Sequence, residues 1–288
     1  MTSDDASFPA QQQDHPGTTA QMRPRPDHGE ETYRGHDRLL DQVALVTGGD
    51  SGIGRAIALA YAREGADVAF TYLPEETDDA EDTARLIRAA GRRALPLAAD
   101  LQRPTACRTV VESVAGEFGG LDILVNNAGY QWARSDGLEE MDDERIDRTL
   151  ATNVGALLRL LRSALPHLRR RPGCVINCSS IQAYDPSAAL LDYAATKAAI
   201  NNLTVNLAQA LGPDGIRVNC VAPGPIWTPL QPATQPPDKV AHFGEDTPLG
   251  RAGQPAEVAP AFVFLASPGD ASYISGTVLG VTGGKPVF

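Results

Sequence analysis

The chain has 288 residues, of which 42% are hydrophobic and 21% are charged, and its formal net charge is −11. This length is enough for one large domain or two small ones with a sizeable buried core, and the composition excludes a fibrous protein. The sequence pI is near 4.9. Such an acidic balance argues against nucleic acid as a partner, because binding phosphates requires a basic face.

Residues 1–40 are rich in Pro, Gln, Asp and His and show neither a helical nor an alternating apolar period. We expect an irregular N-terminal extension here, followed by one domain over residues 41–288. The extension is either disordered or laid in an extended path over the surface, and Phe8, Met22 and Tyr33 favour the second as anchors. It lacks the features of a secretory signal, and no apolar run is long enough to cross a bilayer. We therefore expect a cytoplasmic protein with no membrane partner.

Four cysteines, Cys107, Cys174, Cys178 and Cys220, are spread along the chain without a CxxC pair and without clustered His or acidic ligands. This usage favours reduced thiols that pack as small hydrophobic groups. We expect neither a disulfide nor a metal site.

From Val43 onward, short apolar runs rich in β-branched residues alternate with helix-length segments. The predicted strands lie within residues 43–47, 67–72, 93–100, 121–128, 173–180, 216–223 and 277–284, and two of the predicted helices cover residues 52–65 and 79–91. Apolar strands separated by helices imply a parallel sheet covered on both faces. We predict a single α/β domain with a doubly wound, Rossmann-type sheet, which binds ligands beyond the carboxyl ends of its strands.

The first predicted strand ends in TGGDSGIG, residues 47–54, and runs directly into a helix. A glycine-rich turn at this position lets the backbone approach a phosphate, and the free N–H groups of the helix start attract the anion. A tight turn without a ligand is the alternative. The place of the turn after the first strand favours a dinucleotide.

Tyr193 and Lys197 lie four residues apart in LLDYAATKAAI, an Ala-rich stretch without Pro or Gly. If this stretch is a helix, the two side chains are neighbours on one face. A half-buried tyrosine beside a lysine that reaches to solvent is the alternative. A phenol has an ordinary pKa near 10, and an adjacent ammonium favours its charged form, which would suit it to acid/base work.

Taken together, these pieces resemble the short-chain dehydrogenases/reductases of standard length. The family's TGxxxGxG turn is similar to residues 47–54, its NNAG motif to residues 126–129, and its YxxxK motif to residues 193–197. Its catalytic Ser, thirteen residues before the Tyr, is similar to Ser180, its active-site Asn to Asn153, and its PG motif to Pro223 and Gly224. These motifs occur in the family's order from about residue 43 to the C-terminus.

The resemblance implies hydride transfer between a nicotinamide and a carbonyl or alcohol carbon. Tyr193 would then be the acid/base, and Ser180 would donate a hydrogen bond to the substrate oxygen. By the same resemblance, Lys197 binds the nicotinamide ribose and Asn153 holds a water that relays protons. A strand-end hydroxyl at Ser180 and an Asn153 that satisfies a backbone group remain the alternatives.

The cofactor contacts also follow from the resemblance. Asp100 would contact the adenine, although an acid that caps the following segment is an equal alternative. Asn127 would brace the sheet near the adenosine, and Thr228 would bind the carboxamide of the nicotinamide. The residues expected to bind the cofactor are Gly48, Asp50, Ser51, Gly52, Ile53, Gly54, Tyr72, Leu73, Asp100, Leu101, Asn127, Ala128, Gly129, Tyr193, Lys197, Pro223, Gly224, Ile226 and Thr228.

The choice between NAD and NADP stays open. Relatives that prefer NAD place an Asp after the second strand, and those that prefer NADP place an Arg there or in the glycine-rich turn, whereas this chain has Tyr72, Leu73 and an Asp50 in the turn. The missing cation favours NAD, with Glu75 or Glu76 near the ribose. However, the chain also resembles a bacterial branch of general-stress and aldehyde-reductase-like members, which share its N-terminal extension and include users of NADP.

Residues 223–253 form a Pro-rich segment that is too long for a simple connection, and the family uses this region as a substrate lid. We expect a pocket for a polar, weakly charged substrate, or else packing, from Tyr130, Gln131, Trp132, Gln182, Tyr184 and Trp227.

These observations predict an NAD- or NADP-dependent oxidoreductase that acts on a small aldehyde, ketone or sugar-like alcohol. The resemblance further implies a homotetramer, with the extension across a neighbouring subunit as one arrangement. A non-catalytic cofactor-binding sensor, and an epimerase or dehydratase, are the competing hypotheses.

Overall fold

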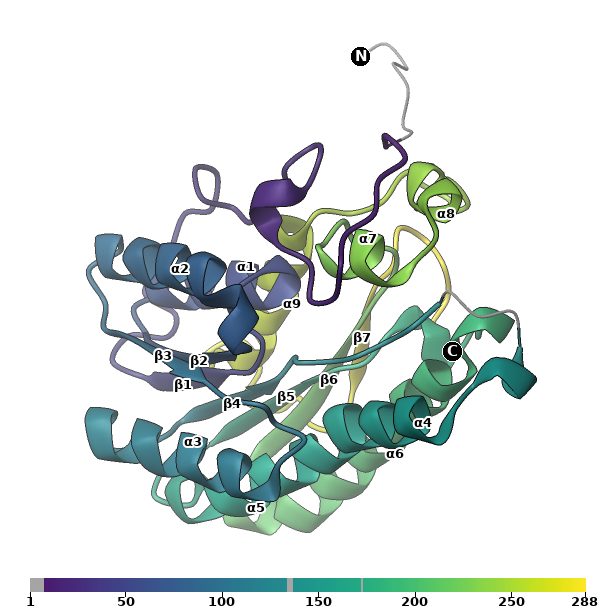
Figure 1. The fold of residues 1–288 in the computed structure, drawn as a ribbon. Coiled ribbons are helices and arrows are strands. Elements are labelled where there is room, and N and C mark those ends of the chain that lie inside the picture. Colours follow the sequence, from purple (N-terminus) through teal and green to yellow (C-terminus); the bar gives the residue numbers. More distant parts are fainter. Residues whose placement is uncertain (1–7, 134–136, 172) are drawn as a thin grey trace.

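In the computed structural model, which describes residues 8–133, 137–171 and 173–288, seven strands form one sheet in the order β3-β2-β1-β4-β5-β6-β7 (Figure 1). Every neighbouring pair of strands is parallel. The predicted doubly wound sheet is therefore confirmed. The strands are β1 (Val43–Val46), β2 (Asp67–Tyr72), β3 (Ala94–Ala98), β4 (Ile123–Asn126), β5 (Cys174–Cys178), β6 (Arg217–Pro223) and β7 (Val278–Val281).

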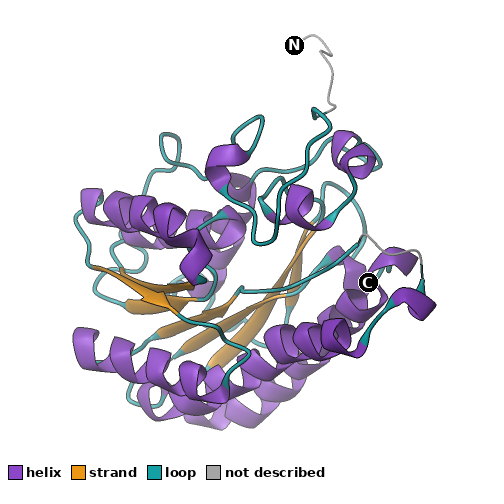
Figure 2. Cartoon of the chain, in the orientation of Figure 1, coloured by secondary structure: helices purple, strands orange, loops and turns teal. Residues whose placement is uncertain are grey.

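Helices cover both faces of this sheet, so the molecule has three layers (Figure 2). One face carries α1 (Gly52–Arg63), α2 (Thr77–Ala89) and α9 (Pro255–Ala266), and the other carries α3 (Pro104–Phe118), α4 (Asp143–Leu150), α5 (Ala156–Leu168) and α6 (Leu191–Leu211). Two short helices, α7 (Leu230–Thr234) and α8 (Pro237–Ala241), follow β6. No helix in the described ranges combines the length and the apolar character that a membrane span requires.

Successive side chains of β1 belong to different hydrophobic cores, which explains why these strands are apolar throughout. Ala44 and Val46 belong to the core that includes α1 and α9, whereas Val43 and Leu45 belong to the core under α3 and α5. Successive side chains of a strand point to opposite faces, and both faces are covered here, so each position buries an apolar group.

The chain leaves β1 toward β2 on one side of the sheet, and β4 lies on the other side of β1. The connections at the carboxyl ends of β1 and β4 therefore diverge and leave a crevice between them. Open α/β sheets bind ligands at such a point.

The N-terminal segment packs on the rest of its own chain, so an extended path over the surface describes it better than disorder. Within the described part, residues 8–42 contain one short 3₁₀ turn, Thr19–Gln21, and otherwise follow an irregular course. This course passes first over α7 and α8 (Figure 1) and then along the start of α9 and the end of α1. The expected anchors hold it: Met22 is fully buried, Phe8 stacks on another ring, and the Tyr33 hydroxyl donates to Glu64 at 2.6 Å.

All four cysteines are buried and form no disulfide, as expected. Burial raises the pKa of each thiol.

Candidate active site

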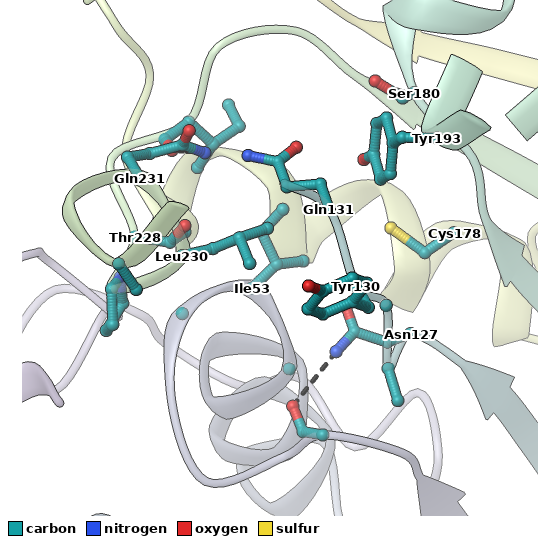
Figure 3. A pocket seen from close by; sticks show the side chains of 18 of the residues that line it. Ile53, Asn127, Tyr130, Gln131, Cys178, Ser180, Tyr193, Thr228, Leu230 and Gln231 are labelled. Atoms are coloured by element: carbon teal, nitrogen blue, oxygen red, sulfur yellow. Dashed lines mark hydrogen bonds between the residues drawn. The ribbon is translucent and has the colours of Figure 1, made fainter. Parts of the chain in front are cut away.

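A cavity of about 440 Å³ lies at the carboxyl ends of the strands. Every residue that the sequence predicted to bind the cofactor borders it, and so does Ser180. The Gly-rich turn forms one wall, and Ser180 and Tyr193 lie across the cavity from Thr228, Leu230 and Gln231 (Figure 3).

The glycine-rich turn depends on the absence of side chains. Gly52 has φ +52°, a left-handed conformation that costs glycine little. A Cβ on Gly54 would lie 1.8 Å from the Gly48 carbonyl oxygen, so no other residue fits there. Helix α1 begins at Gly52, and its first backbone N–H groups lie at the cavity. This is the arrangement that binds a phosphate.

Asn127, just after β4, braces this turn from the neighbouring loop. Its amide donates to the Thr47 carbonyl at 2.9 Å and to the Gly48 carbonyl at 3.0 Å, and Figure 3 draws a hydrogen bond from this amide. In return, the Thr47 hydroxyl oxygen accepts from the backbone N–H groups of Asn127 and Ala128, each at 2.9 Å. The NNAG motif and the TGGDSGIG turn therefore form one rigid unit.

Tyr193 and Lys197 lie one turn apart on α6, which confirms the predicted helix, and both border the cavity. The Lys197 Nζ is 5.2 Å from the centroid of the Tyr193 ring and donates to the Cys178 carbonyl at 2.8 Å. Tyr193 is 9% exposed and Lys197 is 3% exposed. The alternative to a catalytic pair required a lysine that reaches to solvent. Lys197 is instead buried beside the Tyr193 ring.

Ser180 follows β5 and faces the same space as Tyr193 (Figure 3). Its Oγ accepts a hydrogen bond from the Gln182 N–H at 3.1 Å. Because a hydroxyl also has one hydrogen to donate, this contact orients Ser180 without using its donor.

Asn153 is placed differently from the other predicted catalytic residues, because it does not border the main cavity. It lies in a π-helical turn, Ala151–Gly155, between α4 and α5. Its Oδ1 accepts from the Tyr130 N–H at 2.7 Å, and its Nδ2 donates to the Tyr130 carbonyl at 2.9 Å and to the Thr196 hydroxyl at 3.0 Å. The side chain thus satisfies backbone groups, which is the alternative that the sequence left open.

Asp100 does not cap the helix that follows it, so that alternative is wrong. Helix α3 begins at Pro104 with Arg103 as its N-cap. Instead, the Asp100 Oδ1 accepts from the Gln102 N–H at 3.0 Å in the turn before the helix, because the chain makes an extra turn between β3 and α3. The carboxyl group holds this turn at the edge of the cavity.

Carboxyl groups gather at the wall formed by the turn and the start of α2. Asp50 is buried, and its Oδ2 has no hydrogen-bond partner within the described part of the chain. Its pKa is raised well above the ordinary value, chiefly by burial and next by Glu76. Glu76 borders the cavity and accepts from the Leu73 N–H at 2.9 Å. Burial, assisted by repulsion from Asp79 and Glu75, raises the pKa of Glu76 to about 7. Glu75 is exposed and does not border the cavity.

Three of the six expected pocket residues border the cavity, namely Tyr130, Gln131 and Gln182, whereas Trp132, Tyr184 and Trp227 do not. Trp227 is fully buried because the N-terminal segment covers it. Its ring stacks on Phe8 with centroids 3.7 Å apart, and its Nε1–H donates to the Pro24 carbonyl at 2.8 Å. The lid segment, residues 223–253, borders the cavity through residues that include Thr228, Leu230, Gln231, Gln235 and Phe243.

Sequence reasoning missed three residues from the far N-terminus, His15, Pro16 and Gly17, which also border the cavity. The sequence carried no signal for this contact, because the segment has no period and no motif that points to a ligand.

Comparisons with known proteins agree with this geometry. A family model described as enoyl-(acyl carrier protein) reductase matches residues 48–285. The uncharacterized oxidoreductase YghA of Escherichia coli is 52% identical over 279 residues, which cover 96% of this chain and 94% of that protein. Glucose and ribitol dehydrogenase of Daucus carota is 46% identical and is matched over 97% of both chains.

Among solved structures, a short chain dehydrogenase from Burkholderia cenocepacia in complex with NADP is similar to this chain with a TM-score of 0.79. It is 40% identical, and the match covers 86% of this chain and 98% of that one. The extent of these matches, together with the motifs around the cavity, shows that the chain belongs to the short-chain dehydrogenase/reductase family of NAD(P)-dependent oxidoreductases.

Proposed function

We propose that this protein interconverts a small aldehyde, ketone or sugar-like alcohol and its redox partner, with Tyr193 as the acid/base. The supporting observation is that Tyr193, Ser180 and Lys197 border one cavity together with the glycine-rich turn. That turn fits the phosphates of a dinucleotide, because it has no Cβ at Gly54 and presents the N–H groups of α1. When bound, the nicotinamide supplies or accepts the hydride.

The residues of this chain handle the proton and the substrate oxygen. In the reduction, the Ser180 hydroxyl donates a hydrogen bond to the carbonyl oxygen, and the Tyr193 hydroxyl gives its proton to that oxygen. In the oxidation, the Tyr193 phenolate takes the proton back. The buried ammonium of Lys197, whose Nζ lies 5.2 Å from the centroid of the Tyr193 ring, stabilises that phenolate.

In this proposal Asn153 supports the catalytic groups without bordering the cavity itself. A Cβ on Gly129 would lie 3.6 Å from both the Asn153 Oδ1 and the Lys197 Nζ, so the two side chains approach the same loop. By clamping the backbone of Tyr130, Asn153 positions the loop that faces the substrate, in addition to its expected part in a proton path.

Carboxamide groups around the reactive end support a sugar-like or other polar substrate. Gln131, Gln182 and Gln231 border the cavity, and the first and third lie near Tyr193 and Thr228 respectively in Figure 3. Two are anchored by one end: the Gln131 Nε2 donates to Thr234 at 3.0 Å, and the Gln182 Oε1 accepts from the Ser187 N–H at 2.7 Å. Amides held this way offer donors and acceptors to hydroxyl groups. The carrot relative is named for glucose and ribitol.

The remaining parts of the proposal come from the sequence. Its acidic charge and the lack of a signal or a long apolar run favour a cytoplasmic protein without a nucleic-acid or membrane partner, and the family resemblance implies a homotetramer. The change of pattern along the chain divides it into the extension, residues 1–40, and the catalytic domain, residues 41–288.

A spectrophotometric screen of aldehydes, ketones and sugars with NADH, NADPH and their oxidised forms tests the activity. Once a substrate is found, Tyr193→Phe should lower turnover by about 10²–10⁴-fold while cofactor still binds. Tyr184→Phe is the matched control, because that tyrosine lies outside the cavity wall. Full turnover in Tyr193→Phe would refute the assignment. Cofactor binding with no turnover in any assay would favour a sensor.

A further inference from the structure

The N-terminal arm, defined as residues 8–24, is attached at one end to the lid segment. The Phe8 N–H donates to the Ala241 carbonyl at 3.0 Å, at the end of α8, and the Phe8 ring stacks on Trp227. The Gln13 N–H donates to the Pro232 carbonyl of α7, also at 3.0 Å. The first half of the arm therefore follows the lid.

After Gln13 the arm also reaches α2, while it stays in contact with the lid. The Thr19 N–H donates to the Asp79 Oδ2 at 2.7 Å, and Met22 is fully buried against Trp227 and Val240. Between these attachments, residues 15–17 dip toward the carboxyl ends of the strands, as Figure 1 shows for this part of the chain. We call residues 15–17 the arm tip.

The arm tip touches a third element, on the opposite side of the cavity. The His15 ring meets the Tyr130 ring edge-on with centroids 5.2 Å apart, and the Arg148 Nη2 lies 3.3 Å from the His15 Nδ1. Burial and then Arg148 lower the pKa of His15 to about 4. The imidazole is therefore neutral at neutral pH, and its Nδ1 accepts a hydrogen bond from Arg148. Arg148 in turn lies 4.2 Å above the Tyr130 ring.

The arm thus joins the lid, α2 and the β4–α4 wall, and its tip borders the same cavity as the glycine-rich turn. Gly17 makes this close passage possible, because a Cβ there would lie 2.5 Å from the Pro229 carbonyl oxygen. A dinucleotide bound at the turn would therefore occupy the cavity that the tip also borders.

We propose that His15, Pro16 and Gly17 are part of the cofactor-binding site, that they close over the bound dinucleotide, and that the cofactor exchanges when this tip lifts from Tyr130 and Arg148. This inference rests on the proposed function. One hydrogen bond to Arg148 and one aromatic edge on Tyr130 join His15 to the far wall of the cavity, whereas Phe8 and Met22 anchor the arm in an apolar cluster. Segments with few contacts open locally while their anchors stay in place.

The rate of cofactor release tests this arrangement. NADH or NADPH, whichever binds, is loaded on the full-length protein and displaced by excess oxidised cofactor in a stopped-flow fluorimeter. His15→Ala should raise the dissociation rate constant at least about fivefold, because the hydrogen bond from Arg148 and the edge contact with the Tyr130 ring are lost. His36→Ala, an exposed histidine further along the extension, is the matched control and should release cofactor at the unsubstituted rate.

A second variant separates closure from direct contact. Phe8 does not border the cavity, so Phe8→Ala loosens the arm without removing any group that the cofactor touches. Closure by the arm predicts that association and dissociation both become faster in this variant. Release rates within twofold of the unsubstituted protein in both His15→Ala and Phe8→Ala would overturn the inference and leave the proposed function standing. If neither cofactor bound the unsubstituted protein, this inference and the proposed function would both be refuted.

Discussion

The Lys197 ammonium lies 5.2 Å from the centre of the Tyr193 ring and is fixed there by a 2.8 Å hydrogen bond to the Cys178 carbonyl. The bond ties α6 to the end of β5, where Ser180 follows two residues later. One contact therefore sets the distance between the proposed proton donor and the proposed oxygen-binding hydroxyl. It also keeps a positive charge buried next to the phenol.

Replacing Lys197 with Met tests the charge while largely preserving the aliphatic chain. We expect turnover to fall by about 10²–10⁴-fold, because the phenolate loses its neighbouring cation and the ribose loses a donor. Lys239→Met, at an exposed lysine on α8, is the control and should keep full turnover. Steady-state kinetics measures both, and equal turnover in the two variants would contradict the role of the charge.

Replacing Asn153 with Ala removes a buried amide that makes three hydrogen bonds. The Tyr130 N–H and carbonyl would then be buried without partners, so we expect the free energy of unfolding to fall by about 1–3 kcal/mol. Turnover should fall as well, because the Tyr130 loop faces the substrate. Asn202→Ala, at an exposed position of α6, is the comparison in urea unfolding. An Asn153→Ala protein as stable as Asn202→Ala would show that the clamp does not form.

Cofactor preference should follow the carboxyl group of Glu76, at the start of α2. Glu76 would face the adenosine ribose, and above its pKa of about 7 its carboxylate would repel a 2′-phosphate placed beside it. We therefore expect NADH to bind more tightly than NADPH in a buffer above pH 8, and Glu76→Gln to narrow the difference by about tenfold. Glu75→Gln removes the same charge from an exposed neighbour and should leave the ratio of dissociation constants unchanged. Tighter binding of NADPH by the unsubstituted protein would refute this expectation.

The same carboxyl group predicts a pH dependence of stability. Glu76 has a folded-state pKa of about 7, above its ordinary value of 4.5, so the folded state holds a proton that the unfolded state has released between these pH values. The free energy of unfolding should therefore fall as pH rises from 4.5 to 7. Urea unfolding at pH 5 and pH 7.5 measures this fall, which should be smaller in Glu76→Gln. If the free energy of unfolding fell equally in the unsubstituted protein and in Glu76→Gln, titratable groups other than Glu76 would be responsible.

Much of this site is predictable from sequence because its parts are short-range. The glycines of the turn follow from the space that a strand-to-helix connection allows, and Tyr193 and Lys197 meet because a helix repeats every 3.6 residues. The family motifs then identify residues on separate strands, and a parallel sheet brings the carboxyl ends of those strands to one edge.

Other features depend on which groups meet in space. Trp227 is one of the expected pocket residues in the sequence, yet Phe8 stacks on it and it does not border the cavity. By resemblance Asn153 is expected to hold a proton-relaying water, and in the structure its amide bonds to Tyr130 and Thr196. In both cases the residue type is compatible with either role, and the partner supplied by another segment decides between them.

The sequence by itself determined the order of strands and helices, the dinucleotide turn and the Tyr193–Lys197 pair, because each depends on residues close along the chain or on recognisable motifs. Only the tertiary structure placed His15 against Tyr130 and Arg148. The arm has no periodicity of its own, so its path is decided by the surfaces that the folded domain offers it: an apolar cluster for Phe8 and Met22, and an arginine across the cavity for His15.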